Sequence, residues 1–280
     1  MHLPSVPLDL GDGPVVLFVH GQPGGGEDWR ALAEELSRDH RAIAPDRPGW
    51  GSHPRPAMGI AENAAVLARV VERCGAEPPL TVVGHSLGGG VALELAFLRP
   101  DLVGALVLVG SVGVSAALSG LDRLLAVPVV GDGLVRAGGV TIRKAAGAFR
   151  RVPDRWVAGR IAKRATALST IQAVLSSGVG DKVLGRARVS FLAEQRALVE
   201  ETPSLERRLP LLGVPVAVVH GRSDRVVPLS AARLLAERIA GAELIVFPGE
   251  GHLLAFDRTA ELAAIVRRYS RLAAARGEAG

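Results

Sequence analysis

The sequence predicts an α/β fold in which a mostly parallel central sheet is flanked by helices. Short apolar runs alternate with segments of helical periodicity up to residue 111, and the alternation returns from residue 214. Strands and helices that alternate with short connections favour a parallel sheet with helices on both faces. A composition that is 48% hydrophobic but only 4% aromatic suits such a sheet, because buried parallel strands are rich in Val, Leu and Ile.

The elements of the first half follow one another in a regular order. A short edge strand over residues 6–10 leads into a Gly- and Pro-containing turn. Each buried strand is a short apolar run, whereas each helix repeats its apolar residues every three or four positions. The buried strands are expected at residues 15–19, 41–44, 80–83 and 105–109, and the helices at residues 27–38, 60–74 and 87–98.

The regular alternation stops after residue 111 and resumes near residue 214. The intervening part shows helical patches such as residues 155–175 and 190–200, broken by Gly and Pro. A strand, a helix, a strand and a helix then follow at residues 214–219, 230–239, 243–247 and 259–275. We therefore expect one core domain from residues 1–112 and 209–280. Residues 113–208 are expected to form a helical cap over the carboxyl ends of the strands, where ligands bind in such sheets.

The strongest chemical signal in the chain is a Gly-x-Ser-x-Gly spacing over residues 84–88. Ser86 lies between an apolar run and the predicted helix that begins at Leu87. This is the arrangement of a nucleophile elbow, in which a tight, strained turn holds a serine hydroxyl at the mouth of the sheet. Side chains at Gly84 and Gly88 would clash across the turn. We therefore predict that Ser86 is a nucleophile.

A serine hydroxyl needs a base at neutral pH, usually a histidine that a carboxylate orients. Of the seven histidines, His252 follows the last predicted strand, in a loop at the same sheet edge as Ser86. His20 and His220 each end a strand before a glycine, where we expect them to hold loops by hydrogen bonds. Asp224 follows the preceding strand, so the chain order Ser86, Asp224, His252 is that of a nucleophile-elbow hydrolase.

Two aspartates follow predicted strands and compete for the acid role. Asp224 is the predicted acid, and a turn-forming role before Pro228 is the alternative for it. Asp46 is expected to brace its own loop instead, because Asp224 already fills the acid position in the expected order.

An oxyanion intermediate needs two backbone N–H donors that are already in position. The N–H of Leu87 lies at a helix N-terminus, where the helix dipole also favours negative charge. The second donor is expected from the Gly-rich loop at residues 20–26, in which Gln22 is placed to donate its backbone N–H. The Gln22 side chain is expected either to contact substrate or to face solvent.

Taken together, these motifs resemble the α/β-hydrolase superfamily in its capped single-domain members. The resemblance covers the oxyanion, elbow, acid and base motifs and an Asp-x-x-Gly-x-Gly loop at residues 46–51. It implies an α/β-hydrolase fold with a cap inserted after the sixth strand of the family core. Relatives that use an aspartate followed by tryptophan at the elbow are excluded, because this chain has Ser86 and Leu87. An alkyl-enzyme mechanism is therefore not expected.

The function that we expect is acyl transfer to water without a metal or organic cofactor. Ser86 attacks a carbonyl, His252 takes its proton, Asp224 orients the imidazole, and the N–H groups of Gln22 and Leu87 stabilise the oxyanion. A small to medium apolar carboxylic ester is the expected substrate, since the cap is rich in Leu, Val and Ala.

Three other functions are consistent with these motifs. The same three catalytic residues would serve hydrolysis of a carbon–carbon bond in a dicarbonyl compound. A cofactor-free haloperoxidase-like perhydrolase is a second alternative. A non-catalytic ligand-binding protein of this fold belongs to a different class of function.

Composition limits the partners of the protein. A single cysteine, Cys74, permits no intrachain disulfide and no multi-cysteine metal site. Residues 113–208 contain 16 Lys and Arg against 8 Asp and Glu, but these arginines lack aromatic neighbours or a nucleic-acid motif. We expect a small-molecule substrate and no nucleic acid.

The sequence shows no signal-peptide pattern and no apolar run long enough for a membrane span, so we expect a cytoplasmic protein. It gives no prediction of the oligomeric state.

Overall fold

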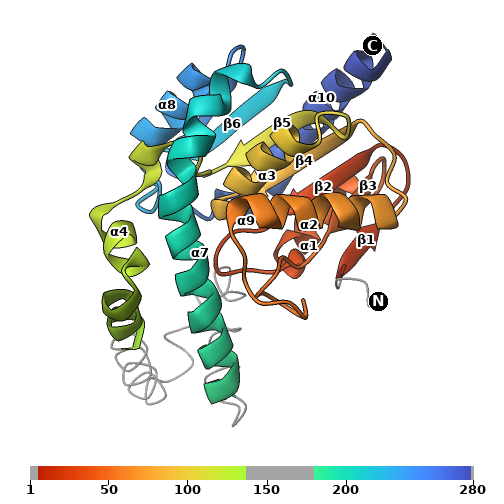
Figure 1. The fold of residues 1–280 in the computed structure, drawn as a ribbon. Coiled ribbons are helices and arrows are strands. Elements are labelled where there is room, and N and C mark those ends of the chain that lie inside the picture. Colours follow the sequence, from red (N-terminus) through yellow and green to blue (C-terminus); the bar gives the residue numbers. More distant parts are fainter. Residues whose placement is uncertain (1–5, 137–179, 279–280) are drawn as a thin grey trace, which may run out of the picture.

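The computed structural model describes residues 6–136 and 180–278, which form a seven-stranded sheet between two layers of helices (Figure 1). The strand order is β1-β3-β2-β4-β5-β6-β7. Strand β1 pairs antiparallel with β3, and every other pairing is parallel. The prediction of an α/β fold with a mostly parallel sheet is confirmed.

The strands lie within two residues of their predicted ranges, with β1 and β6 each beginning two residues later than predicted. Strands β4 and β6 run two residues beyond the predicted ends, and β5 begins two residues earlier, because their neighbours continue to offer backbone partners there. The strands are β1 (Leu8–Leu10), β2 (Val15–Val19), β3 (Arg41–Ala44), β4 (Leu80–His85), β5 (Val103–Val109), β6 (Val216–Gly221) and β7 (Glu243–Phe247).

Most helices also match their predicted ranges, and α3 matches at both ends. The helix expected at residues 27–38 is instead a 3₁₀ turn, η1 (Gly26–Trp29), followed by α1. At Trp29 the backbone (φ −91°, ψ 1°) leaves the α-helical region, which separates the two. The core helices are α1 (Arg30–Leu36), α2 (Ile60–Arg73), α3 (Leu87–Leu98), α8 (Leu229–Arg238), α9 (Leu254–Asp257) and α10 (Thr259–Glu278).

The sheet is buried on both faces, so its strands alternate between two apolar clusters. In β2, Leu17 and Val19 belong to the cluster that includes residues of α2, α3 and α8, whereas Val16 and Phe18 belong to the cluster that includes residues of α1 and α10. This alternation follows from the period of two in a strand. Helices therefore cover both faces of the sheet. The edge at which the parallel strands end, called the open edge below, carries the loops that follow them.

Between β5 and β6 the described chain contains the helices α4 (Gly120–Ala126) and α7 (Gly180–Arg208), a helical stretch over residues 128–136, and the short 3₁₀ helices η2 (Ser115–Ala117) and η5 (Leu209–Leu211). Figure 1 shows α4 and α7 beside each other at one side of the sheet. The patch at residues 190–200 is part of α7, and the patch at residues 155–175 lies outside the described residues. The insertion follows β5, the fifth strand of the described chain. In the ranges that the structure describes, no helix is both long and apolar enough to cross a membrane.

Candidate active site

Five parallel strands end at one edge of the sheet and bring the predicted site residues to it. His20 follows β2, Ser86 follows β4, Gly110 follows β5, Asp224 follows β6, and His252 follows β7. These positions are far apart in the sequence, but parallel pairing sets their strand ends side by side. The candidate site is therefore built by the topology of the sheet.

Ser86 has the strained backbone of a nucleophile elbow. Its φ of 54° and ψ of −123° make it the only non-glycine residue with a positive φ in the part of the chain that the structure describes. The Ser86 N–H donates to the Val109 carbonyl at 3.0 Å, and the Ser86 carbonyl accepts from Gly89 and Val112 at 3.0 and 3.2 Å. These bonds hold a conformation that costs about 1–3 kcal/mol.

The two glycines of the elbow are required by close backbone contacts. A Cβ at Gly84 would lie 2.6 Å from the Gly88 carbonyl oxygen, directly across the turn. A Cβ at Gly88 would overlap the carbonyl oxygens of Val19 and His20, at the end of β2. The clash expected from the sequence therefore exists at Gly84, while Gly88 is needed for the approach of the neighbouring strand.

His252 and Asp224 form a hydrogen-bonded pair, with His252 Nδ1 2.8 Å from Asp224 Oδ2. The other carboxylate oxygen accepts from the N–H groups of Val226 and Val227 at 2.8 and 3.0 Å. Burial of the Asp224 side chain opposes its ionisation, but these three hydrogen bonds outweigh burial and lower the pKa of Asp224. An ionised Asp224 accepts a hydrogen from Nδ1, which leaves Nε2 of His252 as the free lone pair.

The histidine–aspartate pair lies directly against the elbow. A Cβ at Gly110 would lie 3.3 Å from His252 Nδ1 and 3.4 Å from Asp224 Oδ2. The residue before Ser86 also contacts the base loop, because His85 Nε2 lies 3.0 Å from the His252 carbonyl and the two rings are 4.8 Å apart. The structure thus brings Ser86, Asp224 and His252 to one place.

The loop that follows β2 passes next to the side chain of Ser86. A Cβ at Gly21 would lie 3.2 Å from Ser86 Cβ and 2.9 Å from His85 Nδ1. The next residue is Gln22, so its backbone N–H lies close to Ser86. Leu87, the other predicted donor, is the first residue of α3, where N–H groups have no partner within the helix.

The Gln22 side chain is partly exposed and makes a contact that the sequence did not predict. Its Nε2 donates to the Phe191 carbonyl of α7 at 2.7 Å. Since 169 residues separate the two, no local pattern signals the contact. The bond joins the insertion to the predicted oxyanion loop.

The loop-holding roles expected of the other strand-end residues are confirmed. The Asp46 carboxylate accepts from the Gly26 and Ser52 N–H groups, both at 2.9 Å. His20 Nε2 accepts from the Arg47 N–H at 2.9 Å, and His220 Nε2 lies 3.1 Å from the Val227 carbonyl. Burial lowers the pKa of both histidines, which keeps them neutral.

One charged pair beside the site was not expected from the sequence. Arg47 forms an ion pair with Glu194 of α7, and the side chains of both residues are 0% exposed. The motif at residues 46–51 predicts a loop at this place, but it predicts no partner for the Arg47 guanidinium. Glu194 lies 147 positions away, within the insertion.

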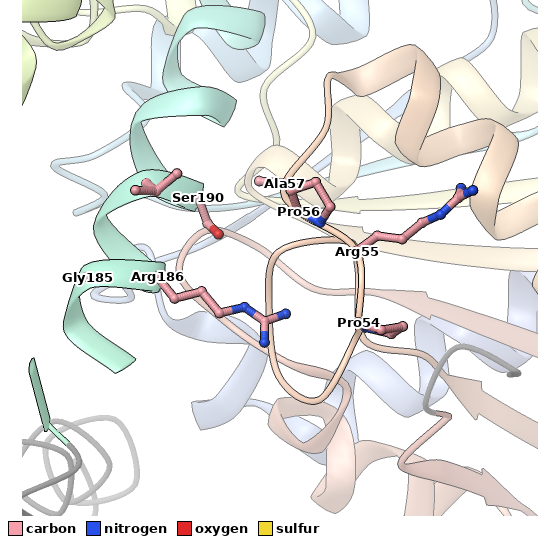
Figure 2. A pocket seen from close by; sticks show the side chains of 8 residues that line it. Pro54, Arg55, Pro56, Ala57, Gly185, Arg186 and Ser190 are labelled. Carbon is pink, nitrogen blue, oxygen red and sulfur yellow. The ribbon is translucent and has the colours of Figure 1, made fainter. Parts of the chain in front are cut away.

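A cavity of about 460 Å³ lies between the loop at residues 54–57 and α7 (Figure 2). Arg186 points from α7 toward the loop and donates to the His53 carbonyl, whereas Arg55 points away. None of the predicted catalytic residues lines this cavity, so it is separate from the cluster around Ser86. The lining residues are Pro54, Arg55, Pro56, Ala57, Gly185, Arg186, Val189 and Ser190. Within the described residues, no group of His, Cys, Asp and Glu is arranged to hold a metal ion.

The fold and the residues at its open edge define a class of protein. The sequence matches the alpha/beta hydrolase family over residues 16–265, and the chain belongs to that family. It is 31% identical over 272 residues to a 2-hydroxymuconate semialdehyde hydrolase of Pseudomonas putida, over 93% of this chain and 88% of that one.

Solved structures share the same fold at lower sequence identity. A thermophilic esterase from Thermogutta terrifontis has a TM-score of 0.67 at 23% identity, over 95% of this chain and 92% of that one. A meta-cleavage product hydrolase, CumD, has a TM-score of 0.61 at 23% identity, over 94% and 92%. The fold is therefore common to hydrolases whose names describe different substrates.

Proposed function

We propose that this protein is a serine hydrolase that forms an acyl-enzyme on Ser86. The observation that carries the proposal is the 2.8 Å hydrogen bond between His252 Nδ1 and the buried Asp224 carboxylate, at the sheet edge that also holds the strained Ser86. A ligand-binding protein has no need of a nucleophile, base and acid in this order.

Each residue of the cluster has a defined part in the proposed reaction. His252 Nε2 takes the proton of Ser86 Oγ as the oxygen bonds to the carbonyl carbon, and the ionised Asp224 stabilises the imidazolium. The N–H groups of Gln22 and Leu87 donate to the oxyanion, and each such donor is worth about a hundred- to a thousandfold in rate. His252 then protonates the leaving alcohol, and water releases the acid by the same steps in reverse.

The proposed substrate is a small to medium apolar carboxylic ester. Support comes from the charge balance beside the oxyanion loop, where Arg47 is fully buried and paired with Glu194. Its guanidinium is therefore not a free cation for an acidic substrate. The Leu-, Val- and Ala-rich insertion supports an apolar acyl group.

Hydrolysis of a carbon–carbon bond in a dicarbonyl compound is the second candidate. It is favoured by the 31% identity to the 2-hydroxymuconate semialdehyde hydrolase over 93% of this chain. The same nucleophile, base and acid would act on the ketone carbonyl, with a carbon leaving group in place of the alcohol.

Labelling and turnover test the proposal together. A fluorophosphonate probe followed by intact-mass measurement is expected to add one label to the wild type and none to Ser86→Ala. Ser111→Ala is the matched control, since Ser111 is a nearby buried serine whose Oγ donates to the Val112 carbonyl. Labelling of Ser86→Ala at the wild-type rate would overturn the proposal.

The substrate class is tested with two panels given to the same preparations. p-Nitrophenyl esters of graded acyl length are expected to be hydrolysed, with turnover lost in Ser86→Ala and retained in Ser111→Ala. A 2-hydroxy-6-oxo-dienoate, followed by its absorbance, reports carbon–carbon hydrolysis. Turnover of the dienoate with esters left intact would replace the first candidate by the second.

A further inference from the structure

The peptide between Gly21 and Gln22 carries the proposed oxyanion donor, the Gln22 N–H, at one end. At its other end, the Gly21 carbonyl has two hydrogen-bond partners. This peptide is trans, so the Gln22 N–H and the Gly21 carbonyl point in opposite directions. The Gly21 carbonyl accepts from Arg47 Nη2 at 2.8 Å and lies 2.9 Å from His20 Nδ1. Whatever holds this carbonyl therefore also sets the direction of the Gln22 N–H.

His20 completes the attachment in one definite tautomer. Its Nε2 accepts from the backbone N–H of Arg47, so the hydrogen of the neutral ring lies on Nδ1 and donates to the Gly21 carbonyl. Burial and the nearby Arg47 guanidinium lower the pKa of His20 and keep the ring neutral. Arg47 Nε also donates to the His20 carbonyl at 2.9 Å, so the arginine binds two successive carbonyls of the loop.

The guanidinium depends on α7 for its balancing charge. Arg47 Nη1 donates to Glu194, and both side chains are fully buried. A buried charge without a partner is strongly unfavourable, so Glu194 is what allows Arg47 to remain beneath the loop. One helical turn away, the Phe191 carbonyl of α7 accepts from the Gln22 side chain. The helix thus contacts the loop directly at the Gln22 side chain and indirectly through Arg47.

We propose that Arg47 and Glu194 are positioning residues for the oxyanion hole. Arg47 orients the Gly21–Gln22 peptide so that the Gln22 N–H faces the oxyanion, and Glu194 of the insertion holds Arg47 in place. This inference rests on the proposed function, because the oxyanion is the one formed on Ser86. It gives the insertion a part in the chemical step beyond any choice of substrate.

A purely structural ion pair would behave differently from a positioning pair. Loss of a structural pair lowers stability and reduces the amount of folded enzyme, without changing the turnover of each folded molecule. Loss of a positioning pair lowers kcat and leaves KM nearly unchanged, because the oxyanion exists only in the transition state and intermediate. Measuring kcat and KM of the folded variants separately therefore distinguishes a positioning pair from a structural one.

The chain offers a matched control pair. Arg208 of α7 forms an ion pair with Glu94 of α3, and so also joins the insertion to the core. Neither residue contacts the oxyanion loop in any described hydrogen bond. Glu94→Gln therefore removes a link between the insertion and the core, in a partly exposed pair, while leaving the Gly21–Gln22 peptide untouched.

The kinetic experiment uses the whole protein with p-nitrophenyl butyrate. Arg47→Lys is expected to lower kcat about a hundredfold, the lower end of the loss of one oxyanion donor. The three donors of an ammonium group lie on one nitrogen and do not span the acceptors that Nε, Nη1 and Nη2 of Arg47 reach. Glu194→Gln is expected to lower kcat about tenfold, with KM within about threefold for both variants. Glu94→Gln is expected to keep both constants. Equal losses in Glu194→Gln and Glu94→Gln would overturn the proposal.

A double variant tests the proposal if the single variants fold poorly, and an NMR measurement tests it if the wild type does not hydrolyse esters. Arg47→Met combined with Glu194→Gln removes both charges with little change in size, and its kcat is expected to stay about a hundredfold low even with a wild-type Tm. Labelling with ¹⁵N-glutamine marks three residues, Gln22, Gln172 and Gln195. The Gln22 amide signal is expected to shift in Arg47→Lys and Glu194→Gln but not in Glu94→Gln. An unshifted Gln22 signal in Arg47→Lys would overturn the proposal whether or not the wild type hydrolyses esters.

Discussion

The burial of His85, the residue before the proposed nucleophile, can be tested by measuring how stability depends on pH. Its imidazole is buried and lies against the rings of Trp29, His252 and Phe256 at 6.5, 4.8 and 5.8 Å. A neutral ring with its hydrogen on Nε2 donates to the His252 carbonyl at 3.0 Å. Burial, followed by the nearby His252, lowers the pKa of His85 from 6.5 to about 4.

The sign of the effect follows from proton binding by the two states. In the unfolded chain His85 gains its proton near pH 6.5, whereas in the folded protein it remains neutral down to about pH 4. The unfolded state therefore binds more protons across this window, and the free energy of unfolding falls as the pH is lowered through it. A difference of about 2.5 pKa units, at about 1.36 kcal/mol each, amounts to about 3 kcal/mol.

The assay is urea unfolding of the wild type and His85→Gln at several pH values between 7.5 and 4. Glutamine places an N–H group near the position of Nε2 but does not titrate. We expect the wild type to lose about 3 kcal/mol more than the variant over this range, a large part of the roughly 5–15 kcal/mol stability of a domain.

The difference between the two proteins isolates His85 from the other groups that titrate on burial. Histidines with a lowered pKa add to the loss at low pH, and carboxyls with a raised pKa oppose it, but both kinds are present in each protein. They are His20, His53, His220, Asp28 and Glu194. If the two unfolding free energies fall in parallel with pH, the account of a neutral buried His85 is wrong.

Three substitutions and one control, Gly241→Ala, test the geometry around the proposed nucleophile. Asp224→Asn is expected to lower kcat about 10⁴-fold, because the amide no longer holds the required His252 tautomer; steady-state kinetics within tenfold of wild type would contradict the acid role. Gly110→Ala and Gly241→Ala both place a side chain at positive φ, so calorimetry is expected to show a similar loss of stability, roughly 1 kcal/mol, in each. Only Gly110 faces His252, so only Gly110→Ala is expected to lose kcat as well, by roughly tenfold or more. Gln22→Ala keeps the backbone N–H and is expected to retain kcat within about tenfold; a thousandfold loss in the same assay would instead make the side chain the donor.

Local patterns were enough to predict the sheet, its helices and the residues at its open edge. The ranges of β2 and α3 match the predicted ones at both ends because contiguous apolar patterns decide them. Ser86 and His252 were predicted from short glycine-containing segments, and parallel pairing then brought them together. Their assignment as nucleophile and base stays a prediction that the labelling experiment tests.

The contacts that the sequence could not predict are those between the loops and the insertion. Glu194 meets Arg47 across 147 positions, and Phe191 meets Gln22 across 169. Glu194 lies within a run of charged and apolar residues that is typical of any amphipathic helix, so the pattern favours solvent for it. Only the packing of α7 against the core decides that this carboxylate is buried.

Burial of the Arg47 charge explains why the insertion has to take part in the site. The His20 and Gly21 carbonyls supply dipoles to the guanidinium but no negative charge, and removing one partner of a buried ion pair costs about 3–5 kcal/mol. Glu194 is the carboxylate that balances this charge, and it belongs to α7 rather than to the core. The core therefore carries an arginine beneath its oxyanion loop whose counter-charge it does not itself supply. If the loop performs the proposed chemistry, a change in the insertion that moves Glu194 alters the rate of that chemistry as well as the choice of substrate.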